Sequence, residues 1–147
     1  MIRPYQPADK DQLLALIRLN IPQYFAPEEA ADFEEYLDQY AETYFVFEET
    51  GRIIGSGGIN YFPESGLARI SWDFVHPDHH GKGIGRRLTQ HRIEEIRKHP
   101  AISKIQVRTS QLACRFYEKM GFTLESTEKD FWAEGFDLYS MGMVLPR

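Results

Sequence analysis

Three glycines at alternate positions, between a predicted strand and a predicted helix, constrain the fold of this chain more than any other feature. Gly81, Gly83 and Gly85 follow the segment 67–75, which alternates like a strand, and precede the predicted helix 84–98. The N-terminus of a helix has backbone N–H groups without internal partners and a positive dipole end, so it favours anions. Glycine lets a phosphate approach the main chain closely. The turn is therefore a candidate diphosphate site, although such a turn can also be structural only.

Charge around this turn supports an anionic ligand. Lys82, Arg86 and Arg87 stand beside the glycines, and the wider segment 80–119 has ten basic and three acidic residues. The segment 19–51 has nine acidic residues and no basic one. The two segments could attract an anion and a cation respectively, or their charges could belong to solvated helix faces. The glycine spacing matches neither the P-loop nor Gly-x-Gly-x-x-Gly.

Length and composition narrow the class of protein. A chain of 147 residues predicts one domain, 1–147. The N-terminus has no apolar signal region, and the longest uncharged run, 53–63, is too short to span a bilayer. The one cysteine excludes an intrachain disulfide and fits the cytoplasm. A net charge of −5 and a short basic segment argue against nucleic acid as a partner.

Hydrophobic periodicity along the chain predicts a mixture of strands and helices. The expected strands are 2–5, 44–48, 52–62, 67–75, 102–108, 122–126 and 137–144. The expected helices are 7–20, 27–40, 84–98 and 110–120. Glycines at 55, 57 and 58 indicate a bulge or a close backbone approach within one strand. The order predicts an α/β (α+β) fold with a mixed sheet.

Two motifs together resemble the GNAT N-acetyltransferase superfamily. The segment VHPDHHGKGIGRRL is similar to the family's pyrophosphate motif, Gln/Arg-x-x-Gly-x-Gly/Ala, with His80 in place of Gln or Arg. The segment ACRFYEKMGF is similar to the family's later helix motif, Ala-x-x-Phe-Tyr-Glu-Lys-x-Gly-Phe. Ser110 stands where members often have Asn. The order of predicted elements resembles that of the family over nearly the whole chain.

The resemblance implies acetyl-CoA as co-substrate and a mostly antiparallel sheet of about seven strands with about four helices. Its fourth and fifth strands, here 67–75 and 102–108, would splay apart to admit the pantetheine arm. The exposed strand edge at Phe74–Val75 could pair with pantetheine amides, and a backbone N–H there could polarise the thioester carbonyl. The expected cofactor-binding residues are Phe74, Val75, His80, Gly81, Lys82, Gly83, Ile84, Gly85, Arg86, Ser110, Phe116 and Tyr117. No metal is expected, because the histidines lack partners at a recognised spacing.

The implied reaction is direct attack of an amine on the thioester, which needs an acid for the leaving thiolate. Tyr117 falls on the family's acid position, and a tyrosine hydroxyl keeps its proton at neutral pH; it could also be only a packed aromatic. Some members have a glutamate base on the fourth strand, where this chain has Arg69. Asp73, expected on the same strand face as Arg69, is the acidic substitute, or else it holds a loop or a substrate cation.

The acceptor is expected to be a small cationic amine or a protein amino group. Its candidate contacts are Trp72, Asp73, Phe131 and Trp132, although the aromatic residues could equally belong to the core. The acidic helix and its flank, 28–42, could form a wall of the acceptor cleft or be a solvated surface. An acyl-CoA-binding sensor without transferase activity is the alternative function. The protein could be a monomer or a homodimer, and no membrane partner is expected.

Overall fold

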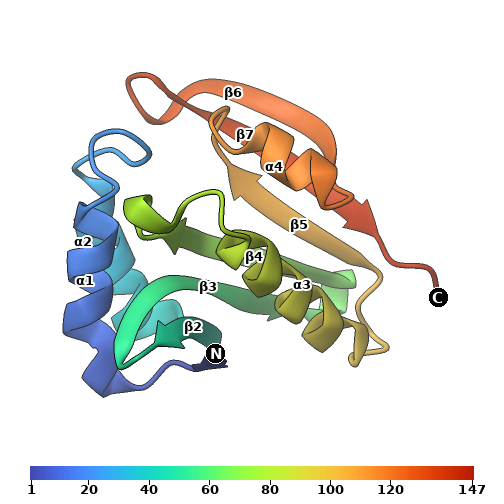
Figure 1. The fold of residues 1–147 in the computed structure, drawn as a ribbon. Helices are drawn as coiled ribbons and strands as arrows, with labels where there is room; N and C mark the ends of the chain where they lie inside the picture. Colours follow the sequence, from blue (N-terminus) through green and yellow to red (C-terminus); the bar gives the residue numbers. More distant parts are fainter.

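The structure, a computed structural model, describes all residues from 1 to 147, and its seven strands form one sheet (Figure 1). Their order in the sheet is β1-β2-β3-β4-β5-β7-β6, and only the pair β4–β5 is parallel. The predicted mixed, mostly antiparallel sheet is therefore confirmed. The strands are β1 (Ile2–Pro4), β2 (Thr43–Glu49), β3 (Arg52–Phe62), β4 (Leu67–Val75), β5 (Lys104–Thr109), β6 (Thr123–Ala133) and β7 (Phe136–Val144).

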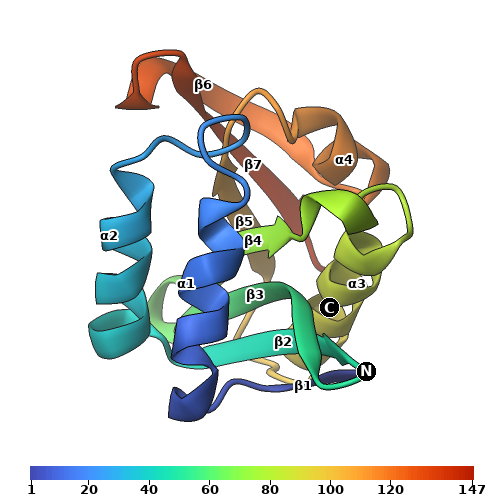
Figure 2. The same ribbon diagram turned by 60° about the vertical axis from the view of Figure 1, so that its left-hand side comes forward.

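Helices cover both faces of the sheet, in two pairs (Figure 2). The helices α1 (Lys10–Arg18) and α2 (Glu29–Glu35) bury their apolar residues against one face, and α3 (Ile84–Arg97) and α4 (Cys114–Lys119) pack against the other. The four predicted helices exist but are shorter than expected. The segment 7–20 begins with a 3-10 turn at Pro7–Asp9, and the segment 27–40 ends in a π-helical turn at Tyr36–Tyr40.

A β-bulge interrupts β4 near its carboxyl end. Ser56 of β3 pairs with Phe74, whereas Gly58 pairs with Ser71, so Trp72 and Asp73 together face one residue of β3. Trp72 has a φ of 55°, in the left-handed region that a bulky residue rarely adopts. The Tyr44 hydroxyl donates a hydrogen bond of 2.8 Å to the Trp72 carbonyl oxygen and so holds the bulge. An extra residue reverses the alternation of side chains beyond it.

The two parallel strands separate after four paired residues. Leu67–Ile70 of β4 pair with Lys104–Val107 of β5, and no pairing continues past Ile70 and Val107. The expected splay of the fourth and fifth strands is therefore confirmed. It leaves the carboxyl-terminal part of β4, from Ser71 to Val75, unpaired with β5.

The final hairpin differs most from the sequence expectation. A strand was expected over 122–126 only, but β6 continues to Ala133 and turns into β7 through Gly135, whose φ is 84°. Residues 123–131 of β6 are all exposed, so this edge strand has no buried face that would give it an alternating pattern. None of the helices is both long enough and apolar enough to cross a membrane.

Candidate active site

The glycine turn leaves a run of backbone N–H groups free at the start of α3. Gly81 has a φ of 79° and Gly83, the N-cap of α3, a φ of 83°; both values favour glycine. A Cβ atom at either position would meet no atom within 4 Å, so the space above the main chain is open. None of the N–H groups of residues 81–86 donates to another backbone group. The turn thus combines open space, free donors and the positive end of a 14-residue helix, as an anion site requires.

His80 connects this turn to the end of β4. Its Nε2 lies 2.9 Å from the Val75 carbonyl oxygen, to which it donates, and its ring packs edge-on against Tyr24. Among the neighbouring histidines, the His76 Nδ1 accepts from the Asp78 N–H at 3.1 Å. His80 thus uses one ring nitrogen to fix the strand edge beside the turn.

A cleft of about 1060 Å³ runs from the glycine turn through the gap between β4 and β5. Most of the expected cofactor residues line it: Phe74, Val75, His80, Gly81, Gly83, Ile84, Gly85, Arg86, Ser110, Phe116 and Tyr117. The Ser110 hydroxyl also accepts from the Leu112 N–H at 3.3 Å. Lys82 is the exception; its side chain is exposed and does not line the cleft.

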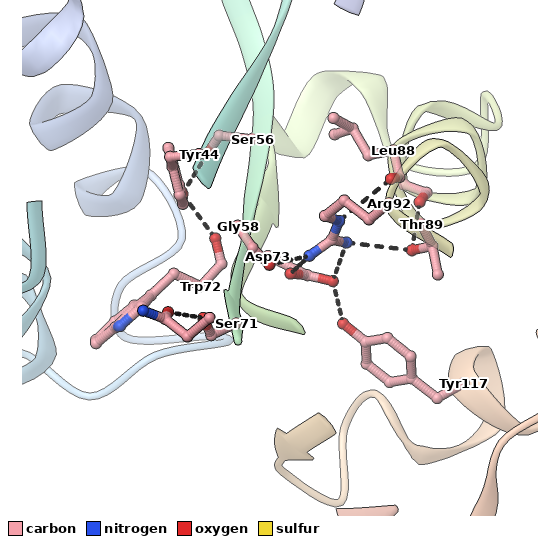
Figure 3. Close-up of polar contacts among 12 residues, drawn as sticks. Tyr44, Ser56, Gly58, Ser71, Trp72, Asp73, Leu88, Thr89, Arg92 and Tyr117 are labelled. Atoms are coloured by element: carbon pink, nitrogen blue, oxygen red, sulfur yellow. Dashed lines mark hydrogen bonds and ion pairs between the residues drawn. The ribbon is translucent and has the colours of Figure 1, made fainter. Parts of the chain in front are cut away.

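A largely buried ion pair lies at the wall of the cleft, between α3 and the bulge of β4 (Figure 3). The guanidinium of Arg92 is fully buried and donates to both carboxylate oxygens of Asp73, at 2.5 and 2.6 Å. It also donates to the Gly58 carbonyl oxygen at 3.2 Å. A Cβ atom on Gly57 would lie 2.7 Å from the Arg92 Cζ, so a glycine is required opposite the bulge. The predicted close approach along β3 is thereby confirmed.

The hydroxyl of Tyr117, from α4, donates to the same carboxylate (Figure 3). Burial of the ring, followed by the negative charge of Asp73, raises the pKa of the Tyr117 hydroxyl well above its ordinary value. Tyr117 therefore keeps its proton over the whole range in which an enzyme is usually assayed. The Tyr117 side chain is buried but also lines the cleft. It therefore lies at the boundary between the hydrophobic core and the site.

The placement of Asp73 corrects one expectation from the sequence. Asp73 was expected to share the strand face of Arg69, but the bulge at Trp72 reverses the alternation. Asp73 points toward α3 and α4, whereas Arg69 lies on the other face and donates to Gln106. The expectation that Asp73 shares a strand face with Arg69 is therefore wrong, and both Asp73 oxygens accept hydrogen bonds from Arg92 or Tyr117.

The opposite face of the sheet forms the other end of the cleft. Trp72 stacks with Phe25, with ring centroids 6.3 Å apart, and contacts Phe33, so it belongs to the core as well as to the cleft wall. Trp132 lines the cleft and donates from its indole N–H to the Thr109 carbonyl oxygen at 3.1 Å. Phe131 does not line it; its ring packs against the Arg108 guanidinium.

The acidic segment 28–42 contributes little to this end of the cleft. Of its acidic residues, only Glu29 and Glu42 line the cleft, and both accept hydrogen bonds from nearby groups of the protein. Glu34 and Asp38 pair with Lys10. The remaining acids of the segment, Glu28, Asp32 and Glu35, are exposed. The expected acidic wall is therefore mostly a solvated helix face.

Sequence reasoning missed Arg92 and Arg108 as site residues, counting them only as part of a basic segment. One signal was available for Arg92. It occupies the same helical stripe as Ile84, Leu88 and Ile96, four residues apart, so a charge stood in a row of apolar positions. A cation in such a row needs a buried partner.

The fold and the cleft are those of an acyl-CoA-dependent transferase, and comparison with known proteins gives the family. Residues 13–122 match the family described as Acetyltransferase (GNAT) family. The chain belongs to this family and is an acetyltransferase of it; the family uses acetyl-CoA. The enzyme, rather than the sensor, is therefore the supported alternative.

Individual relatives act on different amines. An N-alpha-acetyltransferase of Sulfurisphaera tokodaii is 26% identical over 170 aligned positions, covering 98% of this chain and 92% of that protein. An L-amino acid N-acyltransferase of Escherichia coli is 37% identical over 54 residues, 35% of this chain and 31% of that protein. The crystal structure of an aminoglycoside 6′-N-acetyltransferase complexed with coenzyme A superimposes with a TM-score of 0.78 at 19% identity, covering 100% and 98% of the two chains. This last likeness shows the shared fold.

Proposed function

We propose that this protein transfers the acetyl group of acetyl-CoA to an α-amino group, by direct attack within a ternary complex. One observation carries the proposal: the free N–H groups of residues 81–86 open onto the same cleft as the splay of β4 and β5. Two of the relatives, by name, act on α-amino groups. The diphosphate would bind the glycine turn, and the pantetheine would lie along the free edge of β4 at Phe74–Val75.

The chemistry balances with the residues of the cleft. The amine nitrogen attacks the thioester carbonyl carbon, the C–S bond breaks, and the CoA thiolate takes the proton of the Tyr117 hydroxyl. The proton lost by the amine restores Tyr117 through solvent, so the products are an N-acetyl amine and CoA. Tyr117 exchanges its hydrogen bond to Asp73 for one to the sulfur when the cofactor binds.

The surroundings of Asp73 make it a positioning residue in this scheme. Its carboxylate holds the Tyr117 hydroxyl at the cleft boundary and is itself fixed by Arg92. The other carboxylates of the cleft, Glu29 and Glu42, also accept hydrogen bonds, and the scheme assigns none of the three as base. The amine therefore enters the reaction in its unprotonated form. Alignment of the two reactants supplies most of the rate, on the order of 7–11 kcal/mol.

A substitution in the glycine turn tests the proposal. Gly83→Asp puts a side chain with negative charge at a left-handed position above the open space, so calorimetry should show loss of CoA binding. His80→Gln is the matched control, since an amide can donate to the Val75 carbonyl oxygen as the imidazole does. Undiminished CoA affinity in a folded Gly83→Asp protein would overturn the assignment of the turn.

A further inference from the structure

Two arginines at the acceptor end of the cleft have no acidic partner. Arg69 of β4 and Arg108 of β5 both line the cleft, and neither forms an ion pair. The only side-chain hydrogen bond that either one donates joins the Arg69 Nε to the Gln106 Oε1, at 2.9 Å. The terminal nitrogens of Arg69 and all five N–H donors of Arg108 are therefore free for a ligand.

Both guanidinium groups are held in place by aromatic rings. Arg69 lies over the ring of Phe62, with its Cζ 5.1 Å from the centroid. Arg108 lies 5.1 Å from the ring of Phe131 and 5.8 Å from that of Trp132. Stacking on an aromatic face orients the planar group and leaves its edge available, and that edge matches a carboxylate in a bidentate geometry.

The two arginines flank the point where β4 and β5 separate. Arg69 precedes Ile70, the last paired residue of β4, and Arg108 follows Val107, the last paired residue of β5. Both side chains are half-buried, and burial followed by the like charge of Arg108 lowers the pKa of Arg69. An arrangement of two like charges that each lose hydration is unfavourable without an anion.

No acidic side chain of the cleft pairs with Arg69 or Arg108, so a bound anion is the best complement for their charges. Its three carboxylates already accept hydrogen bonds: Asp73 from Arg92, Glu42 from Asn60, and Glu29 from the Ala26 N–H. The phosphates of the cofactor would occupy the turn at residues 81–86, at the other end of β4. The anion at Arg69 and Arg108 therefore belongs to the acceptor.

We propose that the acceptor is an α-amino acid whose carboxylate binds Arg108 and Arg69 while its amine faces the thioester. This inference rests on the proposed function and names its substrate class. A peptide N-terminus lacks this carboxylate, because a neutral amide takes its place beside the amine. The aromatic walls formed by Tyr36, Trp72 and Trp132 suit an apolar side chain.

Three matched amines test the carboxylate. L-phenylalanine, L-phenylalaninamide and 2-phenylethylamine share an aromatic group and an amine, and differ only in carrying a carboxylate, a neutral amide or neither. At equal concentration of unprotonated amine, kcat/KM for L-phenylalanine should exceed that for the other two by roughly 10- to 100-fold, as expected for hydrogen bonds to a charged group.

Substitutions assign that preference to the two arginines. Arg108→Gln and Arg69→Gln should each reduce kcat/KM for L-phenylalanine by about tenfold or more and reduce that for 2-phenylethylamine much less. Arg52→Gln, at an exposed position of β3 outside the cleft, should change neither. The affinity for CoA, measured by calorimetry, should be that of the wild type in all three variants.

The outcomes separate this inference from the proposed function. A folded wild-type protein that does not bind CoA would refute the proposed function itself. If CoA binds and the amide or the phenylethylamine is acetylated as well as L-phenylalanine, the carboxylate inference alone is overturned. If none of the three is acetylated, calorimetry with the CoA-bound protein decides. Binding of L-phenylalanine at least tenfold tighter than its amide supports the inference, and equal, weaker or undetectable binding overturns it.

Discussion

The two faces of β4 treat charge in opposite ways. On the face toward α3 and α4, Asp73 is paired with a fully buried Arg92 and accepts from Tyr117. On the other face, four residues earlier, Arg69 donates one side-chain hydrogen bond and has no acidic partner. Its neighbour Arg108 has neither a side-chain hydrogen bond nor an acidic partner. A one-residue bulge separates the two arrangements. The difference indicates that the paired charges of Asp73 and Arg92 stabilise the structure of the site. The unpaired arginines, in contrast, are available to bind a ligand.

The largest effect is expected from breaking the matched charge. Arg92→Met leaves the partly buried Asp73 carboxylate without its partner, so the free energy of unfolding should fall by up to roughly 3–5 kcal/mol. Denaturant unfolding at pH 7 measures this change. Lys98→Met, which removes an exposed ion pair with Glu95 on the same helix, should cost less than about 1 kcal/mol.

A double variant refines this first prediction. Adding Asp73→Asn to Arg92→Met removes the unpaired charge and should restore part of the lost stability. Equal losses for Arg92→Met and Lys98→Met would show that the buried pair contributes no more than a surface pair. The difference in charge pairing between the two faces of β4 would then not correspond to a difference in the free energy of unfolding.

The next largest effect concerns the hydroxyl that borders both regions. Tyr117→Phe keeps the ring and its packing against Phe116 and Phe122 but removes the proposed acid, so kcat should fall roughly 10²–10⁴-fold. The affinity for CoA should stay near that of the wild type. Tyr61→Phe, on the edge of the core and outside the cleft, is the control and should leave kcat unchanged. A Tyr117→Phe enzyme with wild-type kcat, where chemistry limits the rate, would make Tyr117 a packing residue.

The sequence was sufficient for most of the fold because the buried strands and helices carry strong periodic patterns. All seven strands and four helices were expected, and the splay of the fourth and fifth strands followed from the family resemblance. The long β6 was not expected, because an edge strand exposed on both sides needs no apolar alternation. The π-helical end of the segment 27–40 likewise has no sequence signal that separates it from an α-helix.

The candidate site was predictable where it depends on backbone conformation and less so where it depends on side-chain pairing. The turn was predictable because its glycines are visible in the sequence, and two of them, Gly81 and Gly83, have the positive φ that glycine permits. The face of Asp73 could not be found by counting alternate residues, because nothing about a tryptophan at position 72 indicates a positive φ. The free arginines could not be identified from the sequence, because a sequence does not show which charges remain unpaired after folding.

A smaller effect is expected from pH, and its sign follows from Tyr117. Burial and the charge of Asp73 raise the pKa of the Tyr117 hydroxyl well above its ordinary value, so the donor form persists throughout the usual range and activity should not fall at the alkaline end of that range. At the acidic side, kcat/KM should rise about tenfold per pH unit until it reaches the pKa of the acceptor amine, because only the unprotonated amine attacks. A descending limb with a midpoint below pH 10 that disappears in Tyr117→Phe would mean that the hydroxyl is a stronger acid than its surroundings imply.

The smallest effect is expected from the acidic surface of α2, and its size tells which charges matter for the acceptor. Glu28, Asp32 and Glu35 are exposed and outside the cleft, so salt screens them from a ligand more than a Debye length of about 8 Å away. The triple variant Glu28→Gln, Asp32→Asn, Glu35→Gln should keep kcat/KM for the acceptor within about twofold of the wild type. Its dependence on salt concentration should also be unchanged, in contrast to the loss expected from one substitution at Arg108. A flattened salt dependence would show instead that the acidic helix attracts the amine from solution, and that the free charges of the cleft do not alone select the acceptor.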